Sequence, residues 1–115
     1  MVAGVLKKGV LNKSDMDGRI DRAVRLHEQV NVNRVAFLQT DLEACLTLTS
    51  VAATEYQAGA REAGDRARGE AEKGFSTISR MLSDPKHADH LTYEQHRHFS
   101  EGLGRLRRRL DALSF

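Results

Sequence analysis

Apolar residues recur at steps of three and four along four stretches of the chain, and this spacing limits the fold more than any other feature. The longest of these stripes contains Val35, Leu38, Leu42, Cys45, Thr49, Ala52 and Tyr56. Steps of three and four place side chains on one face of a helix, whereas the alternating pattern of strands is hard to find here. The sequence therefore predicts an all-α protein, a small bundle of about four helices.

The ends of the expected helices carry recognisable signals. Ser14 can cap the first helix, Asn33 can cap the second after an interruption at "NVN", and Thr92 with Gln95 forms a capping box for the fourth. Asp84 precedes the single proline, which disfavours helical angles and ends the third helix. The expected helices cover residues 14–30, about 34–58, about 61–83 and 92 to the last residues.

A segment of helix-forming composition is interrupted by glycine at intervals of five residues. The glycines are Gly59, Gly64, Gly69 and Gly74. Gly59 is expected to end the second helix, so that the second and third helices fold back on each other as a central antiparallel hairpin. Counting outward from Gly59 places Tyr56 near Gly64 and Cys45 near Gly74. Because small residues let two backbones approach closely, the hairpin should be tight near its turn.

The leucine-rich fourth helix is expected to fill the open end of this hairpin. Its stripe runs from His96 through Phe99 and Leu106 to Leu113 at steps of three and four. We therefore expect it to dock within its own chain. The whole chain, residues 1–115, is expected to form one helical domain, with residues 1–13 as a flexible N-terminal arm.

Residues 54–82, "TEYQAGAREAGDRARGEAEKGFSTISRML", resemble one tetratricopeptide-type helical hairpin. The resemblance consists of a long amphipathic helix, a turn glycine at Gly59 and a packing alanine at Ala71. The chain departs from the family pattern at Gly64, where alanine is usual, and at Arg68, where an aromatic residue is usual. No second copy follows at a 34-residue period. The resemblance implies a hairpin suited to protein–protein contact, and it carries over no catalytic residue.

Composition narrows the classes of function. The chain has 115 residues with 18 basic and 16 acidic side chains, a net charge of +2 that gives no strong argument for nucleic acid. No apolar run approaches the roughly 20 residues of a membrane span, so no membrane partner is expected. Cys45 has no second cysteine to pair with, which favours a reducing, cytoplasmic location.

Two groups of residues could carry chemistry. Four histidines, with Asp84, Asp89 and Glu94 among them, could form a transition-metal site, although their spacing matches no known zinc motif. These histidines are His87, His90, His96 and His98. The plainer interpretation is that His96 packs on the apolar stripe and the others face solvent. Cys45 lies in the middle of its stripe and is expected to be a buried, inert thiol.

A basic run near the C-terminus supplies the candidate partner-binding residues, Arg105, Arg107, Arg108 and Arg109. With a core but no catalytic constellation, we expect a small, bacterial-type, non-enzymatic adaptor or assembly subunit without metal or cofactor. Its partner would be another protein or a second copy of itself. Two alternatives stay open: a regulator that binds nucleic acid through the arginine-rich helix, and a histidine-centred helical bundle that binds a metal or small ligand.

Overall fold

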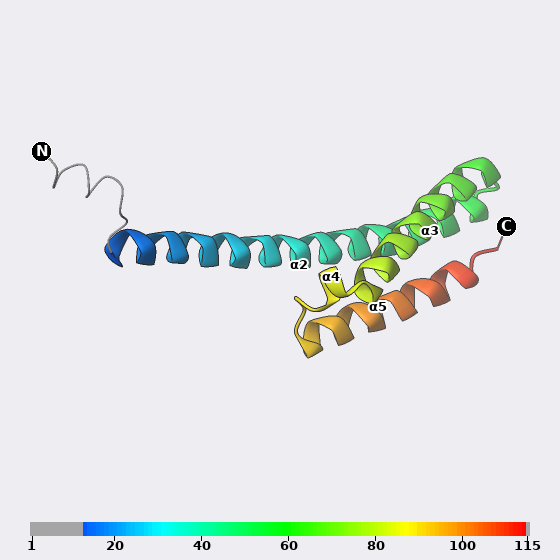
Figure 1. Cartoon of the computed structure of the whole chain (residues 1–115). Coiled ribbons are helices and arrows are strands. Elements are labelled where there is room, and N and C mark those ends of the chain that lie inside the picture. The colour runs from blue at the N-terminus through cyan, green and yellow to red at the C-terminus, as the bar shows by residue number, and fades with distance from the viewer. Residues whose placement is uncertain (1–12, 115) are drawn as a thin grey trace, which may run out of the picture. The chain divides into compact units, whose positions relative to one another are not determined.

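The computed structural model describes residues 13–114 of the chain, and side chains from residue 17 onward. The expected flexible arm, residues 1–13, falls outside the described residues except for Lys13. The structure contains four helices and no strand among the residues it describes (Figure 1). They are α2 (Lys13–Gln57), α3 (Arg61–Ser83), α4 (Pro85–Ala88) and α5 (Tyr93–Asp111). The prediction of an all-α bundle of about four helices is therefore confirmed.

The four helices are divided differently from the expectation. The prediction of a break between the first two helices at residues 31–33 is wrong, because α2 runs without interruption from Lys13 to Gln57. The reason is that Asn33 can cap a helix but does not have to end one: asparagine costs only a fraction of a kcal/mol inside a helix. The number of helices is still four because the structure adds a short helix, α4, between α3 and α5. Asp84 caps the start of α4 by accepting a hydrogen bond from the Lys86 N–H at 3.0 Å.

The contacts divide the chain into two units, Met1–Val32 and Asn33–Phe115. Within the first unit, the structure describes one helical segment, the beginning of α2. Its side chains from Asp17 to Val32 are exposed at nearly every position. The second unit holds the rest of α2 together with α3, α4 and α5, and it contains the buried residues of the described chain.

Gly59 makes the turn between α2 and α3. Its φ angle is +80°, a conformation that glycine adopts at little cost and that residues with a Cβ rarely adopt. The Ala60 N–H donates to the carbonyl of Glu55 at 2.8 Å, which satisfies one of the last carbonyls of α2. The central antiparallel hairpin, with its turn at Gly59, is therefore confirmed.

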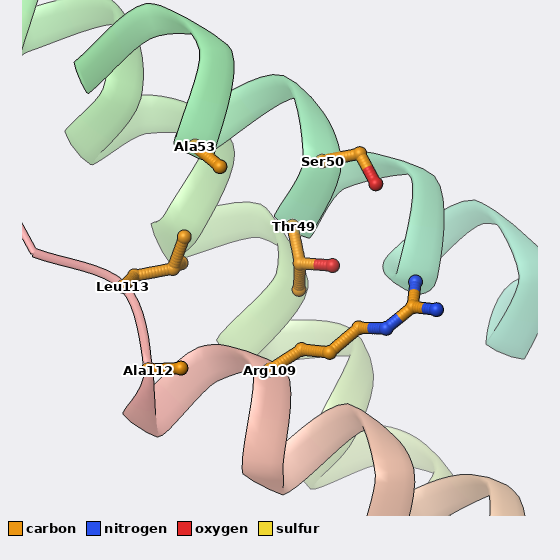
Figure 2. A pocket seen from close by; sticks show the side chains of 6 residues that line it. All are labelled: Thr49, Ser50, Ala53, Arg109, Ala112 and Leu113. Carbon is orange, nitrogen blue, oxygen red and sulfur yellow. The ribbon is translucent and has the colours of Figure 1, made fainter. Parts of the chain in front are cut away.

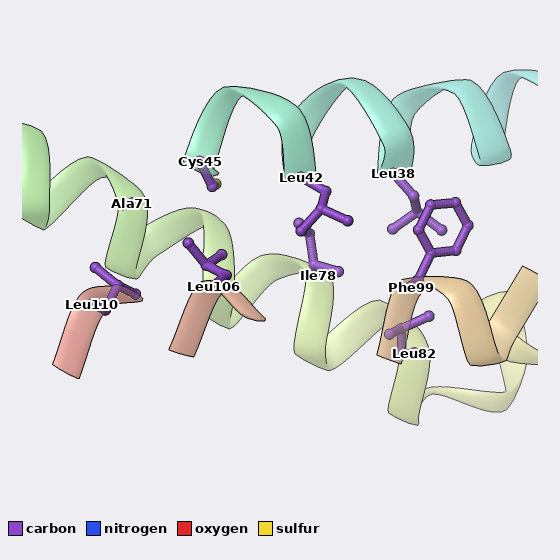
Figure 3. Packing of buried hydrophobic residues seen from close by; sticks show 9 residues of the cluster. All are labelled: Leu38, Leu42, Cys45, Ala71, Ile78, Leu82, Phe99, Leu106 and Leu110. Atoms are coloured by element: carbon purple, nitrogen blue, oxygen red, sulfur yellow. The ribbon is translucent and has the colours of Figure 1, made fainter. Parts of the chain in front are cut away.

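The core of the second unit lies where α2, α3 and α5 meet (Figure 3). Leu42 and Ile78 point toward each other across the hairpin, and Phe99 from α5 lies beside Leu38 and Leu82. All members of the cluster have almost no exposed surface: Leu38, Leu42, Cys45, Ala71, Ile78, Leu82, Phe99, Leu106 and Leu110. The fourth expected helix, α5, thus docks within its own chain.

At three glycines the backbone of α3 or α5 packs directly against a side chain of α2. A Cβ added at Gly64 would collide with the ring of Tyr56, and one added at Gly74 would collide with the Cys45 sulfur. These are the two contacts expected from the register counted outward from the turn. A third, at Gly102, meets Leu42 and brings α5 close to α2. A Cβ at Gly69 would touch nothing within 4 Å.

Candidate interaction surface

The four arginines singled out from the sequence do not share one environment. Arg105, Arg108 and Arg109 are exposed on α5. Arg107 is half-buried, with 35% of its side chain exposed, and it faces α3. The structure therefore leaves three of the four side chains turned to solvent.

Arg107 joins α5 to α3. Its two terminal nitrogens donate to the two carboxylate oxygens of Glu72 at 2.9 and 2.8 Å, and its Nε donates to Asp111 at 3.0 Å. The guanidinium carbon also lies 5.1 Å from the centre of the Phe75 ring. The hydrogen bonds from Arg107 lower the pKa of Glu72, and those same bonds raise the pKa of Arg107. The contacts of Arg107 therefore link α5 to α3 within the chain.

Arg109 borders a shallow pocket between α2 and the end of α5 (Figure 2). The pocket has a volume of about 280 Å³ and is lined by Thr49, Ser50, Ala53, Arg109, Ala112 and Leu113. In Figure 2 the aliphatic part of Arg109 passes under Thr49, and its guanidinium lies at the end away from Leu113. The lining offers one cation and two hydroxyls.

The histidines make separate contacts. His96 Nε2 donates to the carbonyl of Leu82 at 3.1 Å, and His98 Nε2 donates to the side-chain oxygen of Gln39 at 2.9 Å. His87 Nδ1 accepts from Arg34 Nε at 3.3 Å. Within residues 13–114, no group of three or more histidine, cysteine or acidic side chains is placed to hold a metal ion.

Cys45 is buried against α3. Desolvation, and in smaller part the negative charge of Asp41, raise the pKa of its thiol to about 11. Since the thiolate is the reactive form, almost none is present at neutral pH. The environment is that of a packing residue.

A surface that the sequence analysis missed lies on α2. On the side of α2 away from the core, residues at steps of three and four form a second stripe, which we name the outer stripe. It consists of Phe37, Thr40, Ala44, Thr47, Val51 and Thr54, all of them exposed. Phe37 is 49% exposed and Val51 42% exposed, although both are large apolar residues.

The exposed residues around the outer stripe are almost without charge. Between Asn33 and Gln57 eleven positions of α2 are exposed, and Glu43 is the one charged residue among them. On α3 seven of nine exposed residues are charged, and on α5 seven of ten. Charged residues are depleted at the centres of protein interfaces, so the outer stripe has the composition of a surface that is covered in an assembly.

The outer stripe is also hollowed. A groove of about 270 Å³ is lined by Thr47, Ser50, Val51, Thr54 and Glu55. The first four of these are spaced as i, i+3, i+4 and i+7. Four residues in this arrangement form the hole that receives one side chain of a neighbouring helix in knobs-into-holes packing.

A simple signal in the sequence could have identified this surface. Asp41 and Glu43 are the only charged residues between positions 35 and 54, and both fall outside the outer stripe. Charged or chemically reactive side chains, such as the arginines of α5, stand out in a sequence, whereas this face is marked only by the absence of charge.

The first unit presents apolar side chains as well. Its exposed large residues are Ile20, Val24, Leu26, Val30 and Val32. Most helical stability in proteins comes from the packing of an apolar face against other elements. Within the described part of the first unit, from Asp17 to Val32, these five apolar side chains are open to solvent.

Comparisons with family models, with curated proteins and with solved structures found no match for this chain. None of the described helices combines the length and the apolar character required to cross a membrane.

Proposed function

We propose that this protein is a non-enzymatic interaction module that binds a helical partner through α2. The α3 and α5 helices hold one face of α2 in a core, and the opposite face is the binding surface. The resemblance of residues 54–82 to a tetratricopeptide-type hairpin agrees with a role in protein–protein contact, and the cytoplasm suits its single thiol.

One observation carries the proposal: the exposed large apolar residues are concentrated on α2. Of eight such residues in the described part of the chain, seven belong to this helix and the eighth is Tyr93. Two of the seven lie on the outer stripe, and the other five belong to the first unit. Large contiguous apolar patches on the surface of a soluble protein mark sites of interaction. The seven are Ile20, Val24, Leu26, Val30, Val32, Phe37 and Val51.

Site-specific photo-crosslinking in the native cells tests this proposal. A benzophenone amino acid replaces Val51 on the outer stripe, or Ser76 on the exposed side of α3 as the matched control. We expect a discrete crosslinked product from position 51 and none from position 76. The absence of a product from position 51, or equal products from both positions, would contradict binding through α2.

A second candidate function rests on the exposed arginines. Arg105, Arg108 and Arg109 lie within about one turn of α5 and favour an acidic partner such as nucleic acid. Titration of double-stranded DNA and of RNA at several salt concentrations tests it. Binding that weakens steeply with salt and is reduced by Arg108→Glu would support this function, and no binding at low salt would reject it.

A further inference from the structure

We infer that the partner of the outer stripe is an amphipathic helix of another protein, with a row of acidic side chains along one edge of its apolar face. The apolar face covers the outer stripe, and the acidic side chains meet the arginines of α5 that border α2. The inference rests on the proposed function and adds the chemistry of the partner.

Two hollows of the surface meet at Ser50. Ser50 and Arg109 face one pocket from α2 and from α5 (Figure 2). Ser50 also lines the groove on the outer stripe, together with Val51. A helix that lies over this groove therefore passes beside the pocket that contains Arg109.

The groove is suited to an apolar side chain of such a helix. Its lining consists of the exposed Val51, three hydroxyl-bearing residues and, at one border, Glu55. An apolar side chain that enters the groove removes the surface of Val51 from water, which is favourable. Phe37, two heptads before Val51 on the same stripe, offers a second exposed apolar contact. A partner that runs along α2 therefore needs apolar residues at heptad spacing.

Positive charge borders the outer stripe on the α5 side. Gly102, Arg105 and Arg109 follow one another at steps of three and four, so they share one face of α5. That face is turned to α2, because a Cβ added at Gly102 would meet Leu42. The ion pair that joins α5 to α3 uses Arg107 instead. Arg105 and Arg109 thus present two cations one helical turn apart, and they match carboxylates one turn apart on a partner helix.

Glu55 determines which edge of the partner is acidic. Ser50 and Glu55 are five residues apart, about 140° around α2, so they border the groove on opposite sides. A carboxylate of the partner would be attracted by Arg109 on the Ser50 side and repelled by Glu55 on the other. The partner therefore carries its acidic residues on the edge that faces α5, and neutral or basic residues on the opposite edge.

A nucleic acid would use this surface poorly. Its affinity comes mainly from cations in contact with phosphates, and the outer stripe carries no charge at all. An acidic amphipathic helix uses both the uncharged stripe and the two arginines beside it. The arrangement of charge therefore favours a protein helix as the occupant of the outer stripe.

Charge reversal within the crosslinking experiment tests the inference. The benzophenone amino acid stays at position 51, and the second substitution is Arg109→Glu or, as the matched control, Arg108→Glu. Arg108 is also exposed, but it lies two residues after the buried Leu106 and so points away from the core and from α2. The control therefore changes the net charge equally without touching the border of the outer stripe.

We expect Arg109→Glu to lower the yield of the crosslinked product at least about tenfold and Arg108→Glu to change it less than about twofold. Arg109→Gln, which removes the charge without reversing it, should lower the yield less than Arg109→Glu. The circular dichroism of each purified variant reports whether its helices are intact. Mass spectrometry of the product identifies the crosslinked segment, which should combine apolar residues at heptad spacing with Asp or Glu along one edge.

Each outcome bears on the inference. A loss confined to the Arg109 variants, with a crosslinked segment of this pattern, supports it. Equal yields from Arg109→Glu and Arg108→Glu would overturn it, and so would a product that joins two copies of this chain. In both of these cases binding through α2, and with it the proposed function, would stand. If position 51 gave no product, or a product with nucleic acid, the proposed function and the inference would fail together.

Discussion

The two faces of α2 between Asn33 and Gln57 are both poor in charge, yet only one of them is covered. The inner stripe, which consists of Leu38, Leu42, Cys45, Thr49, Ala52 and Tyr56, is buried by α3 and α5. The outer stripe has a similar spacing but carries smaller side chains and is exposed. Apolar spacing identifies the face of α2 that packs within the chain. The opposite face lacks both charge and a covering element among the described residues, which is why we propose it as the binding surface.

The largest expected difference in stability is between alanine substitutions at two adjacent residues, one on each face of α2. Leu38 is 0% exposed, so Leu38→Ala should lower the free energy of unfolding by about 2–5 kcal/mol through lost burial and a cavity. Phe37→Ala removes a half-exposed ring and should change it by less than about 1 kcal/mol in dilute protein. Urea unfolding measured by circular dichroism compares the two. Similar losses for both variants would mean that the outer stripe is part of the core.

A second contrast concerns two glycines of α3. Gly64→Ala places a methyl group against the ring of Tyr56, whose hydroxyl is held by a hydrogen bond to Asp65, and should destabilise by about 1–3 kcal/mol. Gly69→Ala meets nothing within 4 Å and should stabilise by up to about 1 kcal/mol through helix propensity. Thermal melting of both variants measures the difference. A stabilising Gly64→Ala would show that α2 and α3 do not approach closely there.

The interior of the fold follows from local spacing. The contacts of Tyr56 with Gly64 and of Cys45 with Gly74 were predicted by counting outward from Gly59, because two helices joined by a short turn pair their residues in a fixed order. The capping box of Thr92 and Gln95 was equally readable, and both of its hydrogen bonds are present at 3.0 and 2.9 Å. The capping box joins residues that are close in sequence. The hairpin contacts join residues that lie at similar distances on either side of the turn at Gly59.

Two features were not predictable in the same way. The continuity of α2 at residues 31–33 depends on a balance of small propensities, because asparagine is accepted both at a cap and inside a helix. The bidentate contact of Arg107 with Glu72 depends on how α5 rotates against α3, which the heptad pattern of α5 alone does not determine. The role of the exposed arginines as partner-binding residues stays a prediction.

The smallest stability effect concerns the charged contact between α3 and α5. Hydrogen bonds from Arg107 lower the pKa of Glu72 in the folded protein below its ordinary value of 4.5. The ionised carboxylate therefore stabilises the fold above the unfolded pKa, and this contribution is lost as the pH falls through the folded pKa. Since the Glu72 side chain is 38% exposed, solvent screening limits the effect to less than about 1 kcal/mol.

Glu72→Gln should accordingly lower stability slightly at pH 7, and its difference from the wild type should shrink below about pH 4.5. Glu43→Gln serves as the control, because Glu43 accepts a hydrogen bond from Gln39 on its own helix and joins no second helix. Unfolding curves at pH 7 and pH 3.5 compare the variants. A difference that grows as the pH falls would contradict the ion pair.

The most direct test of the contrast between the two faces uses neighbouring residues, Ala44 on the outer stripe and Cys45 on the inner one. The Ala44→Cys variant carries one thiol on each face, and a thiol reagent reports both in a single experiment. The native Cys45 thiol, 2% exposed and with its pKa raised to about 11, should react slowly. The introduced thiol lies at an exposed position of α2 and should react fast in the purified protein. Rapid labelling of both thiols in the folded protein, or slow labelling of both, would contradict the assignment of one face to the core and the other to the exposed binding surface.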